Sequence, residues 1–267
     1  MLQTVFVSGS AGFIGFHIAQ SLLSDGYHVV GYDAFSDYYD VSLKRARHQL
    51  LQKHEKFYGY EARLEDDDTL AAAFEKHKPN DVIHLAAQAG VRHSLENPHA
   101  YIQSNVVGTF NILECARSHS VKHFMMASTS SIYGDCGTHA FKESEKSDYP
   151  LTMYAATKKA DEAIVHSYSH LHDIPSTILR FFTVYGPWGR PDMALFKFVE
   201  NITKDRPIDV YNGGDLKRDF TYIDDVTRAV RLLMDCVPEI ADKNKFSDTS
   251  LSPVAPFRTI NIGNGTP

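Results

Sequence analysis

The stretch VFVSGSAGFIG, residues 5–15, decides the fold. A short run rich in β-branched residues ends at Ser8, and an apolar stretch with helical spacing follows the glycines. Glycine lets the backbone turn tightly and approach a pyrophosphate, and a helix starting there offers free N–H donors. The pattern predicts a strand, a phosphate-binding turn and a helix; a tight turn with close helix packing is the alternative. The predicted cofactor-binding residues of this turn are Gly9, Gly12, Phe13, Ile14 and Gly15.

The next apolar run, HVVGYD, ends at Asp33, 18 residues after Gly15. An acidic side chain at the end of this strand accepts hydrogen bonds from the adenosine ribose and repels a 2′-phosphate. The position therefore predicts NAD rather than NADP as the cofactor. The alternative is that Asp33 caps the loop that follows it.

Strand-like and helix-like segments alternate over the first two-thirds of the chain. The predicted strands are 4–8, 28–32, 56–60, 81–86, 122–128 and 176–182, and the predicted helices are 13–25, 42–54, 67–77, 97–119 and 152–171. This alternation predicts an α/β fold with a parallel sheet covered by helices on both faces. We expect residues 1–182 to bind the cofactor.

The regular alternation of strand-like and helix-like segments ends after residue 183. Here the sequence predicts helices at 193–204 and 224–236, short strands at 208–211 and 219–223, and a long loop at Pro238–Phe257. We expect residues 183–267 to form a smaller substrate-binding region over the carboxyl ends of the sheet strands, where ligands bind in open α/β folds.

Composition narrows the class of protein. The chain has 267 residues, 43% of them hydrophobic, and a net charge of −6, which argues against nucleic acid or an anionic membrane as the main partner. Three separated cysteines suit a reducing compartment, and we expect a cytoplasmic protein without a membrane span. The scattered histidines and cysteines show no metal-ligand spacing, so we expect no metal.

Tyr154 and Lys158 in YAATK are four residues apart, so they share one face of a helix. The ammonium group and a positively charged nicotinamide ring both favour the tyrosinate, which can remove a proton from a sugar hydroxyl. A hydroxyl cluster at residues 128–131, in the string MASTSSIYG, ends the preceding strand and can hydrogen-bond a reacting alcohol. A solvated helix face and ordinary strand-end capping are the alternatives. The predicted catalytic residues are Tyr154, Lys158 and Thr129, with Lys158 also touching the cofactor.

Six motifs in sequence order resemble extended short-chain dehydrogenases/reductases that act on nucleotide sugars: SGSAGFIG, HLAAQAGVR, ASTSSIYG, YAATK, RFFTVYGPWGRPDM and RDFTYIDD. YYDVSLKRAR and RFFTVYGPWGRPDMALFKF look specifically like UDP-glucuronate 4-epimerases, and the likeness covers essentially the whole chain. It implies a Rossmann-type doubly wound sheet, tightly held NAD with Ala86 at its site, and a UDP-sugar substrate. It also implies a homodimer built on the helices near 97–119 and 152–171.

The resemblance also implies which reaction the site favours. Related dehydratases and decarboxylases carry carboxyl groups in the string that here reads TSSIYG, residues 129–134. Oxidation of glucuronate at C4 gives a β-keto acid, so an epimerase has to hold the carboxylate against loss of carbon dioxide. We expect that grip from Thr129, Ser130, Ser131, Thr183 and Arg190, since an arginine fork suits a carboxylate.

At the UDP end, the resemblance places Arg218 at the diphosphate and Tyr211 near the uracil, although Tyr211 can equally be a packing residue. Arg92 lies either beside the sugar or in a structural ion pair. Two features depart from the family pattern: Arg63 stands where relatives carry an aspartate near the adenine, and relatives continue beyond Pro267, so we expect a truncated substrate-binding region. A UDP-glucose 4-epimerase and a non-catalytic NAD-binding module remain the alternative functions.

Overall fold

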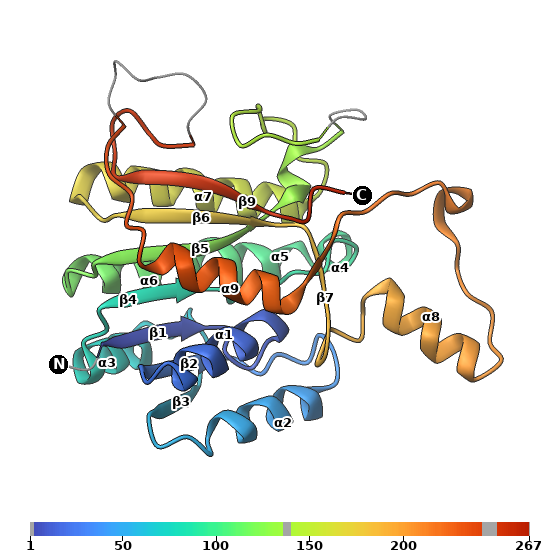
Figure 1. The fold of residues 1–267 in the computed structure, drawn as a ribbon, viewed down its shortest axis with the longest axis horizontal. Helices are drawn as coiled ribbons and strands as arrows, with labels where there is room; N and C mark the ends of the chain where they lie inside the picture. Colours follow the sequence, from blue (N-terminus) through green and yellow to red (C-terminus); the bar gives the residue numbers. More distant parts are fainter. Residues whose placement is uncertain (1–2, 136–139, 242–249, 267) are drawn as a thin grey trace.

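A parallel sheet forms the middle layer of the protein (Figure 1). The structure is a computed structural model that describes residues 3–135, 140–241 and 250–266, without the side chains of Tyr211 and Asn212. Within these residues, seven strands pair in the order β3-β2-β1-β4-β5-β6-β9. Their bounds are β1 Thr4–Ser8, β2 His28–Asp33, β3 Phe57–Glu61, β4 Asp81–His84, β5 His123–Thr129, β6 Ser176–Phe181 and β9 Phe257–Ile262.

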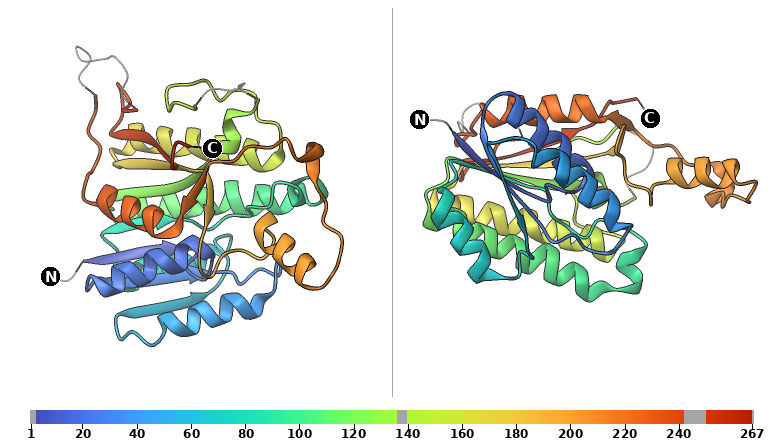
Figure 2. Two further views of the ribbon diagram at one scale, coloured as in Figure 1. Left: turned by 45° about the vertical axis from the view of Figure 1, so that its right-hand side comes forward. Right: turned by 90° about the horizontal axis from the view of Figure 1, so that it is seen from below.

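Helices cover both faces of this sheet (Figure 2), which is why its central strands are almost fully buried. One apolar layer lies between the sheet and helices α1 and α9, and the other lies between the sheet and helices α3, α6 and α7. The helix bounds are α1 Phe13–Ser24, α2 Val41–Leu51, α3 Asp67–His77, α6 Gly108–Ser118, α7 Met153–His172, α8 Ala194–Thr203 and α9 Ile223–Met234. The predicted doubly wound α/β fold is confirmed.

The strand order reverses next to β1, which pairs with β2 on one side and with β4 on the other. The chain therefore leaves the carboxyl ends of β1 and β4 toward opposite faces of the sheet. A crevice opens at such a switch point, and ligands of open α/β sheets bind there. Both the glycine turn after β1 and the segment after β4 border this crevice.

The predicted helix at 97–119 is confirmed in extent, but it is not a regular α-helix throughout. After a separate short helix α4, His93–Glu96, the chain forms α5, Pro98–Tyr101, then a π-helical segment η1, Ile102–Val107, and then α6 without a break. Pro98 lacks an N–H group and starts α5, where the Asn97 side chain accepts from Ala100 N at 3.4 Å. The π-helical segment carries one extra residue per turn, which a pattern of regular helical spacing does not reveal.

Part of the predicted smaller region belongs to the sheet layer. Helix α9 packs against α1, and β9 adds to the sheet beside β6. Strand β7, Thr183–Tyr185, pairs in parallel with β8, Phe220–Tyr222, in a separate two-stranded sheet. The predicted strand at 208–211 is wrong, because 206–210 form a loop that runs into the 3-10 turn η3, Tyr211–Gly214. The apolar Val210 is 57% exposed there and has no sheet to pack against within the described chain.

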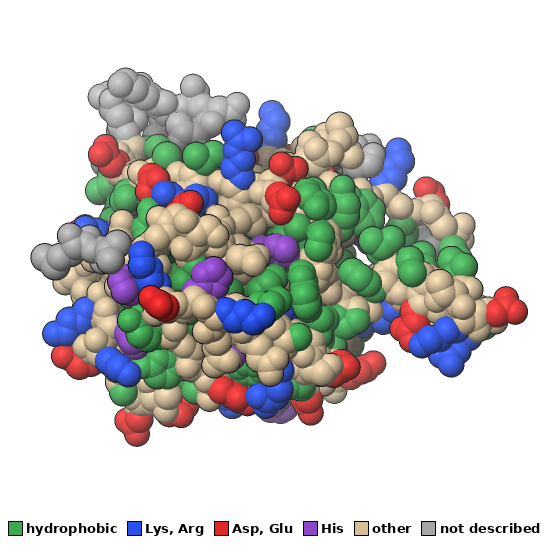
Figure 3. Space-filling view, turned by 60° about the horizontal axis from the view of Figure 1, so that its bottom comes forward, with side chains coloured by type: hydrophobic (Ala, Val, Ile, Leu, Met, Phe, Trp, Pro, Cys, Tyr) green, Lys and Arg blue, Asp and Glu red, His purple; other side chains and the backbone are tan. Residues whose placement is uncertain are grey.

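Helix α8 stands away from the body of the molecule (Figures 1 and 3). None of its residues is buried, although Leu195, Val199 and Ile202 are apolar. The described part of the loop predicted at Pro238–Phe257 leads directly into β9, and residues 242–249 within it lie outside the described part of the chain. No helix among the described residues is long and apolar enough to cross a membrane.

Candidate active site

The turn between β1 and α1 is built by its glycines. Gly9 has a positive φ of 72°, and its N–H donates to Tyr32 O at 2.7 Å. A Cβ on Gly15 would lie 2.1 Å from Gly9 O, so only glycine allows the helix to start this close to the turn. The first turn of α1 therefore faces the crevice with backbone N–H groups that have no partner within the helix. This cradle fits the pyrophosphate of a dinucleotide.

Asp33 ends β2 beside that turn. Its two carboxylate oxygens accept from Ala11 N at 3.0 Å and Phe35 N at 2.9 Å, so it does cap the following loop. Burial raises the pKa of Asp33, while the Phe35 N–H and the Lys44 ammonium act to lower it. Each carboxylate oxygen keeps a second lone pair, so contact with a ribose hydroxyl remains compatible with the cap.

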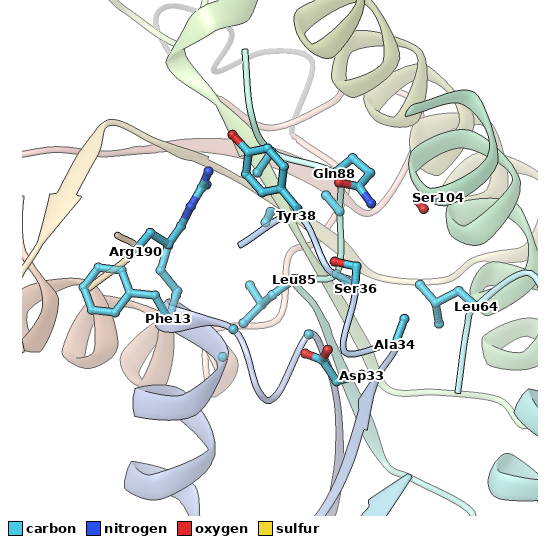
Figure 4. A pocket seen from close by; sticks show the side chains of 18 of the residues that line it. Phe13, Asp33, Ala34, Ser36, Tyr38, Leu64, Leu85, Gln88, Ser104 and Arg190 are labelled. Carbon is cyan, nitrogen blue, oxygen red and sulfur yellow. The ribbon is translucent and has the colours of Figure 1, made fainter. Parts of the chain in front are cut away.

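A cavity of about 270 Å³ runs along the switch point from Asp33 to Arg190 (Figure 4). Of the predicted site residues, the following line it: Gly9, Gly12, Phe13, Ile14, Gly15, Asp33, Ala86, Thr129, Tyr154, Lys158 and Arg190. They come from the first 15 residues, from three strand ends, from α7 and from the loop before α8. The cavity therefore brings the predicted cofactor turn and the predicted catalytic groups together.

Helix α7 places Tyr154 and Lys158 on one side of the cavity. Thr152 caps the helix by accepting from Ala155 N at 3.2 Å, so α7 starts at Met153, directly before Tyr154. Thr129 ends β5, and its Oγ1 accepts from Ser131 N at 3.1 Å. The Thr129 hydroxyl thus caps the strand end, and Thr129 is one of the residues that line the cavity.

Lys158 is held by a buried partner that the sequence analysis did not include. Its Nζ donates to Asp161 Oδ2 at 2.8 Å, and the two side chains are 3% and 0% exposed. Burial raises the pKa of Asp161, and the Lys158 charge acts to lower it. The buried His84 contacts Thr109 Oγ1 through Nε2 at 3.0 Å. Burial holds the pKa of His84 well below its usual value, so this imidazole is neutral at neutral pH.

Arg190 points into the other end of the cavity, but its guanidinium has a partner. Nε and Nη2 donate to the two carboxylate oxygens of Asp192 at 3.0 and 2.6 Å. Burial opposes ionisation of Asp192, yet the hydrogen bonds from Arg190 hold the pKa of that carboxyl below its usual value. Both side chains are about four-fifths buried, with exposures of 22% and 18%.

The other predicted substrate residues do not line the cavity. Ser130 and Ser131 lie in the 3-10 turn Ser130–Tyr133 directly after Thr129, and Thr183 starts β7 between the lining residues Phe182 and Val184. Arg92 is exposed before α4. The exposed Arg218 donates to Lys217 O at 2.8 Å, and the Tyr211 side chain lies outside the described part of the structure.

The structure adds lining residues that the sequence reasoning missed. They include Ser36, Tyr38, Tyr39 and Lys44 from the segment after β2, and Gln88 and Ser104 near η1. The string YYDVSLKRAR, residues 38–47, was the available signal for the first group. Arg63 also lines the cavity and pairs with Glu65 at 3.1 Å. No group of three metal-ligating side chains occurs among the residues that the structure describes.

Known proteins share both the sequence and this architecture. The model of the NAD dependent epimerase/dehydratase family matches residues 5–247. A probable UDP-glucuronate 4-epimerase of Rhizobium meliloti is 52% identical over 264 residues, which cover 98% of this chain and 77% of that protein. UDP-glucuronate 4-epimerase 1 of Arabidopsis thaliana is 46% identical, with 99% and 61% covered.

Among solved structures, UDP-glucuronic acid 4-epimerase from Bacillus cereus, in complex with UDP-glucuronic acid and NAD, aligns with a TM-score of 0.84. The two sequences are 33% identical, and the alignment covers 98% of this chain and 77% of that chain. The family model spans far more than half of the chain. The chain therefore belongs to the NAD dependent epimerase/dehydratase family.

Proposed function

We propose that this protein interconverts UDP-glucuronate and UDP-galacturonate by oxidation and re-reduction at C4. The observation that carries the proposal is the cavity itself, which Tyr154, Lys158 and Thr129 line together with the residues of the glycine turn and Arg190. Relatives named as UDP-glucuronate 4-epimerases support the choice of sugar, since they match over almost the whole chain.

The chain's own residues supply proton transfer and orientation. Tyr154 removes the proton of the C4 hydroxyl, and the Thr129 hydroxyl holds that oxygen in place. The Lys158 ammonium stabilises the tyrosinate while Asp161 balances its charge. NAD, when bound against Gly9–Gly15, Asp33 and Ala86, supplies a hydride acceptor and donor for C4. Rotation of the 4-keto sugar between the two half-reactions presents its other face and inverts the configuration.

The same intermediate explains why a carboxylate grip is needed. In a 4-keto glucuronate, the bond from C5 to the carboxylate can break to release carbon dioxide, and its electron pair then forms an enolate that takes up a proton. Ser130, Ser131, Thr129 and Thr183, together with Arg190, are the residues we assign to holding the carboxylate out of alignment. The string Thr129–Gly134 contains no carboxylic acid that would protonate the enolate.

The UDP end is assigned to the segment 183–222, since α9 and β9 belong to the sheet layer. Arg218 is proposed to meet the diphosphate, Tyr211 the uracil and Arg92 the sugar. We also propose a homodimer, which the exposed apolar side chains Leu95, Ile102 and Phe110 on α4, η1 and α6 support. The free thiols Cys115 and Cys236 support a cytoplasmic location.

The test is incubation of the purified protein with NAD and either UDP-glucuronate or UDP-glucose, with products identified by NMR. UDP-galacturonate as the main product supports the proposal. Conversion of UDP-glucose to UDP-galactose, without conversion of UDP-glucuronate, would favour the UDP-glucose 4-epimerase alternative. A UDP-pentose as the main product from UDP-glucuronate would refute the carboxylate grip. Tyr154→Phe should keep binding of UDP-glucuronate but abolish conversion; retained turnover would exclude Tyr154 as the base.

A further inference from the structure

The segment that runs from the end of β2 into α2 reaches across the cavity to the loop that carries Arg190. Tyr38, in the loop before α2, donates its hydroxyl proton to Asp192 Oδ2 at 3.0 Å. The same oxygen accepts from Arg190 Nη2 at 2.6 Å, and the centre of the guanidinium lies 5.8 Å from the Tyr38 ring centroid. Figure 4 shows the two side chains side by side at the end of the cavity that lies away from Asp33.

The position of Tyr38 is fixed from more than one side. Its ring packs on that of His93 at a centroid distance of 4.9 Å. A Cβ on Gly90 would lie 2.2 Å from the Tyr38 hydroxyl oxygen, so glycine at position 90 leaves the space that the phenol occupies. The ring is partly buried and lines the cavity, and it contacts residues from two other segments of the chain, Gly90–His93 and Arg190–Asp192.

A second contact holds the backbone just before Arg190. The buried Arg47 of α2 donates through Nη2 to Trp188 O at 2.5 Å and through Nη1 to Ala11 O at 3.0 Å. Nη1 also reaches Tyr39 OH at 2.9 Å. One side chain thus links the glycine turn, the segment after β2 and the loop that carries Arg190.

These contacts determine where the guanidinium can point. An isolated arginine side chain has several rotatable bonds, and fixing it costs conformational entropy. Here Asp192 occupies two N–H groups of the fork and Tyr38 fixes Asp192, while Arg47 fixes the main chain. The remaining N–H groups of Arg190 are thereby directed in advance, which reduces the cost of binding an anionic group.

We propose that Tyr38 is a positioning residue for Arg190, acting through Asp192 to set where the guanidinium meets the carboxylate of the sugar. This inference rests on the proposed function, in which Arg190 holds that carboxylate. It assigns control of substrate geometry to a loop that also flanks the cofactor. A neutral sugar has no carboxylate, so Tyr38 should matter little for UDP-glucose.

The experiment is a double-mutant cycle on the NAD-loaded protein with Tyr38→Phe, Arg190→Ala and the double variant. Tyr38→Phe keeps the ring and removes only the hydroxyl. Tyr60→Phe is the matched control, because it removes a hydroxyl that bonds His77 Nε2 at 2.9 Å outside the cavity. Each variant is assayed for kcat and KM with UDP-glucuronate, for the share of pentose product, for binding of both UDP-sugars by calorimetry, and for NAD affinity.

We expect Tyr38→Phe to lower kcat/KM for UDP-glucuronate by about 10- to 100-fold, the size of a lost hydrogen bond to a charged group, and to raise the pentose share. NAD affinity and UDP-glucose binding should not change. In the Arg190→Ala background, Tyr38→Phe should have no further effect. An equal effect in both backgrounds, or none in either, would overturn the inference, because Tyr38 would then not act through Arg190.

Calorimetry separates this inference from the proposed function. A parent protein that binds UDP-glucuronate without converting it would refute the proposed function, while the cycle on binding affinity would still decide the role of Tyr38. A parent that binds UDP-glucose but not UDP-glucuronate would overturn both. A loss of affinity for both sugars in Tyr38→Phe, with Tyr60→Phe unaffected, would mean a general structural role and would also refute the inference.

Discussion

Replacement of Gly15 by alanine is the most direct perturbation of the cofactor turn. The new Cβ would lie 2.1 Å from Gly9 O and 2.8 Å from Gly9 C, both of them backbone atoms that no side-chain rotation can move. Restoring an ordinary contact requires a shift of about 1 Å between the turn and α1, and overpacking of this kind costs about 1–3 kcal/mol. Alanine gains ~1 kcal/mol in helix propensity, so the net loss of stability is about 0–2 kcal/mol.

The effect on the cofactor should exceed the effect on stability. Gly9 O accepts from Gly12 N at 2.9 Å, so moving Gly9 also moves the N-terminal cap of α1. We expect NAD affinity, measured by calorimetry, to fall at least about tenfold, which corresponds to ~1.4 kcal/mol. Gly26→Ala is the control: its φ of 89° makes alanine strained, yet it lies at the opposite end of α1. It should lower the urea midpoint and leave NAD affinity unchanged. Parent-like NAD binding by Gly15→Ala would refute the assigned role of the turn.

Three other substitutions test the surroundings of the site. Asp33→Asn keeps the shape of the side chain but removes the charge that repels a 2′-phosphate. Calorimetry should therefore show weaker binding of NAD and tighter binding of NADP. Unchanged selectivity between the two cofactors would mean that Asp33 serves only as a loop cap. Glu162→Gln breaks a buried bidentate ion pair with Arg180, whose two N–O distances are 3.0 and 2.8 Å. The free energy of unfolding, measured in urea, should fall by ~3 kcal/mol. A fall of less than about 1 kcal/mol would contradict this reasoning. Burial lowers the pKa of His123 to about 4, below its value of 6.5 in the unfolded chain. The unfolded state therefore binds the proton first, and the free energy of unfolding should fall as pH drops from 6.5 to 4, by up to ~3 kcal/mol. Urea titrations of the parent and of His123→Gln across this range should diverge, and parallel curves would exclude His123 as the cause.

Short sequence patterns were enough to predict those site residues whose positions depend only on their neighbours in the sequence. The glycine turn reads as strand, turn and helix within eleven residues, and the face shared by Tyr154 and Lys158 follows from helical spacing alone. Asp33 was found because a strand end is marked by its apolar run. Each of these predictions needed only a short window, and each predicted residue lines the cavity.

Contacts between distant segments were not predictable in this way. Tyr38 and Asp192 are 154 positions apart, and nothing in either neighbourhood identifies the other as its partner. Strand β9 carries Arg258, Thr259 and Asn261 among its apolar residues, so its pattern does not read as a buried strand, yet it pairs with β6 along its full length. The partner of Lys158, Asp161, lies only three residues away on the same helix, yet the sequence analysis missed it, because that spacing alone does not show that the pair is buried.

The pairing of β9 with β6 has a consequence for how the chain is made. Strand β6 ends at Phe181, and its outer edge stays open until the ribosome has added β9, from Phe257 onward. At the usual rate of synthesis this interval lasts about 4 to 15 seconds. During that time one edge of β6 has no partner strand, although every residue of β6 is buried in the finished fold. An unpaired apolar edge can pair with a strand of another chain, and such pairing leads to aggregation. Slower translation of residues 182–256 should therefore lower the yield of soluble protein, and a chaperone that binds the exposed β6 should restore that yield.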